Sequence, residues 1–288
     1  MQRIDGRVAV VTGAASGLGR SLAHAWGAAG CSLVVADVED GPLRQVAAEL
    51  AGAGVACAAV PTDVADFSSV EALAAATLER FGAAHILCNN AGVGARGSVM
   101  DLSLESWEWV LGVDLWGVIH GLRAFLPILR AQDESHVVNT SSMAGLLSFP
   151  LGAPYNAAKA AVVSLSETLY QELRLVDATV GVSVVCPGGM QTRFLDSGRN
   201  RPANLASRTP VPEPPPAFAR IIERVRELID VGGAAPDDIA AQVVQAVRDD
   251  RFYVLTHRAM YEDALQARLA DILDGRAPST VKVVADDD

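Results

Sequence analysis

Short runs of β-branched and apolar residues alternate with longer helical patterns along the whole 288-residue chain. The runs are continuous rather than alternating, which indicates strands buried on both faces, and each intervening pattern is long enough for the helical crossover that parallel strands require. The sequence therefore predicts an α/β fold, a doubly wound, seven-stranded parallel sheet with helices on both faces. The predicted strands cover residues 8–11, 33–36, 55–60, 86–88, 137–140, 182–185 and 252–255.

One region departs from this alternation. Residues 193–235 contain six prolines, followed by an amphipathic segment over 218–229. A linker between domains has a similar composition, but too little chain follows to form a second domain. We therefore predict a single domain over residues 1–288, with a mobile insertion at about 193–235 that covers the carboxyl edge of the sheet as a substrate lid. The acidic tail from about residue 277 is expected to be frayed.

Charge and cysteine content exclude several kinds of partner. The chain has 34 acidic and 23 basic side chains, a formal net charge of -11, opposite in sign to a surface that binds nucleic acid or anionic membrane. The four cysteines are far apart, with no C-x-x-C pair, so we expect reduced core thiols and no metal site. No apolar run reaches the ~18 residues that span a bilayer, and no signal peptide is visible, so we expect a cytoplasmic protein.

A glycine-rich loop follows the first predicted strand. Gly13, Gly17 and Gly19 have the spacing G-x-x-x-G-x-G at the point where the strand gives way to a helix. This spacing lets the backbone turn tightly and approach a pyrophosphate at the helix N-terminus. A glycine cluster can also simply end a strand, and its position between strand and helix favours the phosphate loop.

An acidic residue follows at the end of the second strand. Asp37 lies 24 residues after Gly13, where a carboxylate accepts hydrogen bonds from the adenosine ribose hydroxyls. A turn residue is the alternative interpretation. Because a 2′-phosphate would be repelled by Asp37, with no Arg or Lys adjacent in sequence, the pattern favours NAD over NADP.

Tyr155 and Lys159 are four residues apart near the start of a predicted helix, so their side chains share one face. A phenol has an ordinary pKa of about 10, and a value near 7 requires about 4 kcal/mol of preferential stabilisation of the phenolate. A neighbouring ammonium supplies that kind of stabilisation. The pair is common in helices by chance, so its meaning depends on the rest of the pattern.

The rest of the pattern is present. Asn89-Asn90-Ala91-Gly92 follows the fourth strand, Ser142 lies thirteen residues before Tyr155, and Pro187-Gly188 follows the sixth strand. Together with the glycine loop, these motifs resemble the short-chain dehydrogenase/reductase family over about residues 5 to 256. The resemblance implies a single-domain Rossmann fold, a homodimer or homotetramer, and hydride transfer between a nicotinamide cofactor and an alcohol or carbonyl compound.

The resemblance also implies roles for individual residues. Tyr155 would be the general acid/base, Lys159 would lower its pKa and bind the nicotinamide ribose, and Ser142 would hydrogen-bond the reacting oxygen. Ser141 is a rival to Ser142, but the thirteen-residue spacing favours Ser142. The residues implied to bind the cofactor are Gly13, Ser16, Gly17, Leu18, Gly19, Asp37, Asp63, Val64, Asn90, Ala91, Gly92, Tyr155, Lys159, Pro187, Gly188 and Thr192.

One position departs from the family pattern. Asp114 stands where the family usually has an asparagine that completes a proton-relay tetrad of catalytic residues. A carboxylate accepts hydrogen bonds as an amide oxygen does, but it cannot donate one unless it is protonated, and it adds charge near Lys159. Asp114 would either raise the pKa of Lys159 or keep its own proton, and the sequence leaves both possibilities open.

The sequence as a whole predicts an NAD-dependent short-chain alcohol dehydrogenase or ketone reductase acting on a hydrophobic secondary alcohol or ketone. Steroid, terpene and aryl alcohols are not distinguished. The alternatives are an inactive NAD-sensing protein of the same fold, which the intact Ser142, Tyr155 and Lys159 argue against, and a nucleotide-sugar dehydratase or epimerase, which normally carries a larger carboxyl-terminal domain. The candidate pocket residues are Val93, Leu147, Phe149 and Met190, with Arg96 and Arg193 interpreted as surface residues.

Overall fold

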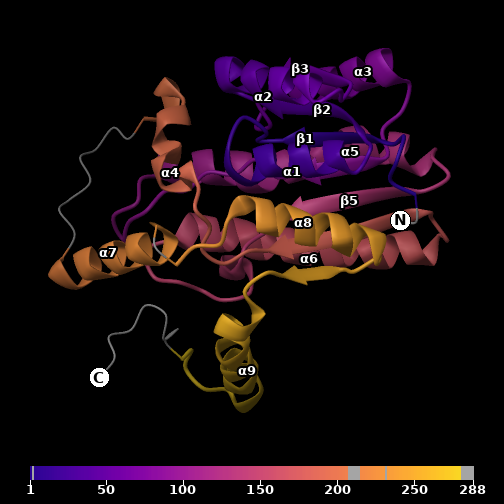
Figure 1. The fold of residues 1–288 in the computed structure, drawn as a ribbon. Coiled ribbons are helices and arrows are strands. Elements are labelled where there is room, and N and C mark those ends of the chain that lie inside the picture. Colours follow the sequence, from indigo (N-terminus) through magenta and orange to yellow (C-terminus); the bar gives the residue numbers. More distant parts are fainter. Residues whose placement is uncertain (2, 207–214, 231, 280–288) are drawn as a thin grey trace.

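Seven parallel strands form the predicted sheet, in the order β3-β2-β1-β4-β5-β6-β7. This computed structural model describes residues 1, 3–206, 215–230 and 232–279 (Figure 1). The chain reverses direction across the sheet between β1 and β4, and ligands of open α/β sheets bind where the strand order reverses. The strands are β1 (Val8–Thr12), β2 (Ser32–Asp37), β3 (Cys57–Pro61), β4 (Ile86–Asn89), β5 (Ser135–Thr140), β6 (Val180–Cys186) and β7 (Tyr253–Leu255).

Helices cover both faces of the sheet, as predicted. Alternate residues of β1 enter different cores: Val11 packs with Trp26 and Val243 on one face, and Val10 packs with Phe125 and Val162 on the other. Two buried faces explain why the strands read as continuous apolar runs. One face carries α1 (Gly17–Ala28), α2 (Asp40–Gly52) and α8 (Pro236–Arg248), and the other carries α3 (Phe67–Phe81), α5 (Gly117–Arg130) and α6 (Ala153–Leu175).

The helix limits follow the predicted signals. Asp66 caps α3 by accepting a hydrogen bond from the Ser68 backbone N–H, and Gly82 ends the helix in the left-handed conformation that glycine adopts easily. Pro236 opens α8, where its missing N–H costs nothing. The third strand begins at Cys57 rather than at residue 55 as predicted.

The predicted insertion at 193–235 lies partly outside the described residues, which omit 207–214 and 231. The described part begins with 3-10 turns over Arg193–Asn200 and Ala203–Leu205 and continues in α7 (Pro216–Asp230). Both lie at the end of the sheet toward which the strands point, and α9 (Arg258–Asp274) projects away from the sheet (Figure 1). Most of the tail predicted to fray, residues 280–288, is also outside the described residues.

A long apolar helical segment runs through α4 (Leu104–Leu111), a π-helical turn (Gly112–Trp116) and α5. By length and composition alone this segment, Leu104–Arg130, could cross a membrane, with a mean hydropathy of 1.3 in an 18-residue window, although charged residues such as Glu108 and Asp114 interrupt it. Phe125 and Leu129 of α5 are fully buried against the sheet. These two side chains of the segment therefore belong to the protein core.

A buried histidine lies in the middle of the sheet. The Ser183 hydroxyl donates to the carbonyl of Arg251, so His136 Nε2 must donate to Ser183 Oγ, 2.8 Å away. His136 Nδ1 is buried and has no hydrogen-bond partner among the described residues. A second ring proton would therefore place an unpaired charge in the core. Burial lowers the pKa of His136 to about 3, and the positive N-terminus adds to this effect.

We predict that His136 makes the protein less stable in mild acid. The unfolded chain binds this proton below the ordinary pKa of 6.5 and the folded protein does not, so the free energy of unfolding decreases by up to about 1.4 kcal/mol per pH unit as the pH falls through that range. Urea unfolding at several pH values checks this. His136→Gln, which can still donate to Ser183, should show a shallower pH dependence than the parent; equal slopes would contradict the prediction.

Candidate active site

A cavity of about 680 Å³ opens at the carboxyl ends of the strands. The segments that follow β1, β2, β3, β4, β5 and β6 all contribute to its wall. Of the residues that the sequence assigns to catalysis or cofactor binding, only Asp114 is not in this wall, and it lies buried behind it. The predicted residues that line the cavity are Gly13, Ser16, Gly17, Leu18, Gly19, Asp37, Asp63, Val64, Asn90, Ala91, Gly92, Ser142, Tyr155, Lys159, Pro187, Gly188 and Thr192.

The glycine loop has the shape needed to hold a dinucleotide. Gly13 and Gly17 have φ of 67° and 53°, in the left-handed region that other residues rarely adopt. A side chain at position 19 would clash with the Gly13 carbonyl oxygen. Asp37 stands beside the loop and accepts hydrogen bonds from the backbone N–H groups of Ala15 and Glu39, at 3.0 Å each. The loop therefore fits a pyrophosphate, with a carboxylate at the ribose position.

The segment after β4 is hydrogen-bonded to its neighbouring strands. Thr12 Oγ1 accepts from the backbone N–H groups of Asn90, at 2.9 Å, and Ala91, at 3.1 Å. The Asn90 amide in turn donates to the Thr12 carbonyl, at 3.0 Å, and accepts from the Thr140 hydroxyl, at 3.3 Å. These bonds fix the loop across the ends of β1, β4 and β5, beneath the centre of the cavity.

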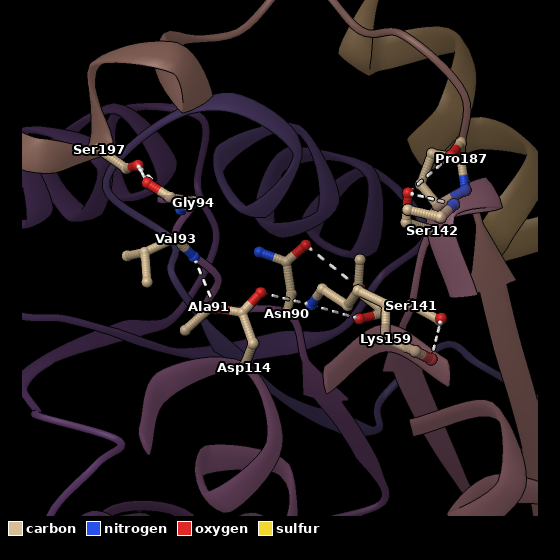
Figure 2. A network of polar contacts seen from close by, with 12 residues as sticks. Asn90, Ala91, Val93, Gly94, Asp114, Ser141, Ser142, Lys159, Pro187 and Ser197 are labelled. Atoms are coloured by element: carbon tan, nitrogen blue, oxygen red, sulfur yellow. Dashed lines mark hydrogen bonds and ion pairs between the residues drawn. The ribbon is translucent and has the colours of Figure 1, made fainter. Parts of the chain in front are cut away.

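A buried ion pair lies behind the cavity (Figure 2). Lys159 Nζ lies 3.1 Å from Asp114 Oδ2 and donates to the Thr140 carbonyl, also at 3.1 Å. The second oxygen, Asp114 Oδ1, accepts from the Val93 N–H at 2.8 Å. Both carboxylate oxygens thus face donors, and a protonated carboxyl group would have no acceptor for its hydrogen. Burial raises the pKa of Asp114, whereas Lys159 and the Val93 N–H act against this rise. From the two donors that face its oxygens, we infer that Asp114 is ionised.

The electrostatics follow from this pair. Burial opposes the charge of Lys159, but Asp114 and Tyr155 outweigh it and hold the pKa of Lys159 above its ordinary value. Burial also raises the pKa of Tyr155; Lys159 and a hydrogen bond with Ser142 act against this rise, and Asp114 adds to it. The Lys159 ammonium lies 5.5 Å from the centre of the Tyr155 ring. An additional positive charge in the cavity would therefore be needed to bring the phenol toward neutral pH.

The two neighbouring serines differ in their surroundings. Ser141 is buried, and its hydroxyl donates to the Lys159 carbonyl at 2.8 Å. Ser142 accepts from the Ala144 N–H and reaches the Pro187 carbonyl only at 3.4 Å (Figure 2). Ser142 is thus the serine whose hydroxyl is available to a ligand beside Tyr155, as its spacing in the sequence suggests.

The outer wall of the cavity is apolar and differs in part from the prediction. Val93, Phe149 and Met190 line it, but Leu147 packs into a separate core cluster with Met143 and Val163. Arg96, interpreted from the sequence as a surface residue, is half-buried in this wall, whereas Arg193 is exposed. The sequence analysis did not identify Trp109, Leu151, Phe194, Leu205, Ile221, Ile222, Val225 and Ile229, which also line the cavity.

Several polar contacts hold the 193–205 segment over the cavity, two of which lie beside the proposed cofactor and catalytic residues. Arg199 pairs with Glu39 at 2.6 Å, beside the ribose position after β2. Ser197 Oγ lies 3.0 Å from the Gly94 backbone N–H, which donates to it. Neither contact could be recognised from the local sequence, because Glu39 and Arg199 are 160 residues apart and Gly94 and Ser197 are 103 residues apart. Phe194, whose ring centre is 5.1 Å from that of Tyr155, covers the phenol on the same side.

Within the described part of the chain, no group of three or more His, Cys, Asp or Glu side chains could hold a metal ion. All four cysteines are free thiols, and three of them are buried. Burial raises the pKa of Cys31, Cys88 and Cys186 to about 12. These three thiols are therefore unreactive at neutral pH.

Comparisons with known proteins agree with this geometry. The family model described as short chain dehydrogenase matches residues 7–202. A short chain dehydrogenase/reductase from Burkholderia phymatum, solved in complex with NAD, is 42% identical with a TM-score of 0.92, over 97% of this chain and 98% of that one. The C alpha-dehydrogenase of Sphingobium sp. strain SYK-6 is 31% identical, over 96% of this chain and 89% of its own. The CLA biosynthesis dehydrogenase/reductase of Lactiplantibacillus plantarum is 29% identical, over 96% and 97%.

Proposed function

Because the chain belongs to the short-chain dehydrogenase/reductase family of oxidoreductases, we propose that it transfers a hydride between NAD(H) and a hydrophobic secondary alcohol or ketone. The observation that carries the proposal is the meeting of Ser142, Tyr155 and Lys159 in the wall of the cavity that the glycine loop also lines. The apolar outer wall supports a hydrophobic substrate. The alternative, an inactive NAD-sensing protein, would have no need of Ser142, Tyr155 and Lys159 together at this position.

The residues around the glycine loop would hold the cofactor. Gly13, Gly17 and Gly19 would leave room for the pyrophosphate, Asp37 would accept from the ribose hydroxyls, and Thr192 would bind the carboxamide. Hydride acceptance, and a positive charge near Tyr155 in the oxidised form, are the chemistry that NAD supplies when bound. The remaining steps fall to the chain's own side chains.

In alcohol oxidation the hydroxyl proton must leave as the hydride leaves carbon. Ser142 would hold the substrate oxygen, and Tyr155 would take the proton as general base. Lys159 has three donor hydrogens, two of which face Asp114 and Thr140, so one remains for the cofactor ribose. Asp114 would act through Lys159 as a positioning residue, because it is buried and does not reach the cavity.

The first prediction from this proposal concerns the cofactor. NAD should bind at least tenfold more tightly than NADP, because a 2′-phosphate would meet the Asp37 carboxylate at a cost of about 4 kcal/mol for unit charges at 4 Å. Calorimetric titration measures both affinities. Asp37→Asn should narrow the gap, whereas Asp40→Asn, a change of an exposed acid that pairs with Arg44, should leave it unchanged. Equal affinities in the parent protein would rule out this reading of Asp37.

The second prediction concerns the general base. Tyr155→Phe should reduce kcat for a panel of secondary alcohols by about 100- to 10,000-fold, because the hydroxyl transfers the proton. NADH absorbance measures kcat, and calorimetry should show NAD affinity within a few-fold of the parent. Tyr170→Phe, in the same helix but packed against Phe252, is the matched control and should keep full activity. A Tyr155→Phe enzyme with a tenth of the parental kcat would refute the role.

The third prediction follows from the ionised Asp114. The rate of alcohol oxidation should rise with pH as Tyr155 loses its proton. The negative charge of Asp114 raises the pKa of that phenol. Asp114→Asn removes the charge, so the rising limb of kcat/KM against pH should move to lower pH while activity persists. Rate profiles of the two proteins with one alcohol provide the test. A shift to higher pH would contradict the charge argument.

A further inference from the structure

Arg96 is a cation in the cavity wall for which the described residues provide no anionic partner. It lies in the loop between β4 and α4, is half-buried, and lines the same cavity as Ser142 and Tyr155. Within the described part of the chain it makes no hydrogen bond or ion pair. The other cations of the wall differ: Lys159 pairs with Asp114, Arg199 pairs with Glu39, and Arg193 is exposed to solvent.

The surroundings of Arg96 oppose its charge. Burial lowers the pKa of Arg96, and the like charge of Arg226, on α7, lowers it further; among the described residues no carboxylate acts in the opposite direction. Apolar side chains such as Phe149, Leu205 and Val225 line the cavity. A guanidinium in such a place is costly unless an anion meets it.

The backbone holds Arg96 in a fixed relation to the catalytic helix. The next residue, Gly97, donates from its N–H to the Leu151 carbonyl at 3.1 Å and forms a bridge with Gly152. Gly152 immediately precedes α6, the helix that carries Tyr155. Leu151 has φ of 66°, an unusual conformation for a leucine. The loop that carries Arg96 is thus joined to the start of the helix that carries the proposed base.

We propose that Arg96 binds a carboxylate of the substrate, so that the natural substrate is an apolar secondary alcohol or ketone with a carboxylate remote from the reacting carbon. This inference rests on the proposed oxidoreductase function and adds the class of substrate. A planar guanidinium matches a carboxylate through two parallel hydrogen bonds. The exposed Arg226 adds attraction for a single negative charge. A guanidinium also binds phosphate in this way, so a phosphate monoester is included in the test below.

The kinetic experiment compares medium-chain (ω−1)-hydroxy fatty acids with their methyl esters. These probes have the same secondary alcohol and differ in the distant charge. The acid should have a kcat/KM about 10- to 100-fold higher than the ester, and Arg96→Gln should remove the advantage through KM with little change for the ester. Arg268→Gln, a change of an exposed arginine on α9, is the control and should keep the acid preference.

A binding experiment separates this proposal from the proposed function. Calorimetry measures the affinity of the same acid and ester, which requires no turnover. If neither compound is oxidised but the acid binds at least tenfold more tightly to the parent protein and not to Arg96→Gln, the carboxylate site stands and the proposed reaction fails. Equal affinity of acid and ester in the parent, or tighter binding of a phosphate monoester of the same chain, would overturn the proposal.

Discussion

The ion pair between Lys159 and Asp114 is the interaction on which the site depends. Both side chains are almost completely buried, at 2% and 0% exposure, so each charge offsets much of the cost of burying the other. The pair also joins four parts of the chain: Asp114 of the π-helical turn holds the loop after β4 through Val93, and Lys159 of α6 holds the end of β5 through Thr140. Without the Asp114 charge, Lys159 would still donate to the Thr140 carbonyl.

The π-helical turn brings Asp114 to this place. An α-helix that continued unchanged from α4 into α5 would have no extra residue, whereas the turn over Gly112–Trp116 widens the helix at the position of Asp114. An asparagine here would offer one acceptor and one donor, but the two groups that face residue 114, the Val93 N–H and the Lys159 ammonium, are both donors. A carboxylate is therefore the better match to these surroundings, which gives the departure from the family pattern a physical reason.

The parts of the structure that could be predicted are those with a local signal. Continuous apolar runs predicted the parallel sheet, and the spacing of Tyr155 and Lys159 along one helix predicted that they would share a face. The burial of Arg96 and the Glu39–Arg199 pair could not be predicted, because each depends on segments distant in sequence that meet only in the folded chain. Leu147 was misplaced for a similar reason: an apolar residue after β5 packs equally well into a cavity wall or into the core, and only the path of the backbone decides.

The 193–205 segment and α7 make different kinds of contact with the rest of the cavity wall. Arg199 attaches the 193–205 segment to Glu39 beside the ribose position, and Ser197 attaches it to Gly94, both by polar contacts. The helix α7 turns Ile222 and Val225 toward the cavity and has Arg226 near Arg96, so that its contacts are apolar or repulsive. An anion between the two arginines would turn that repulsion into attraction. A carboxylated substrate would thus supply the negative charge that is missing between Arg96 and Arg226, whereas a neutral substrate would leave the two cations opposed.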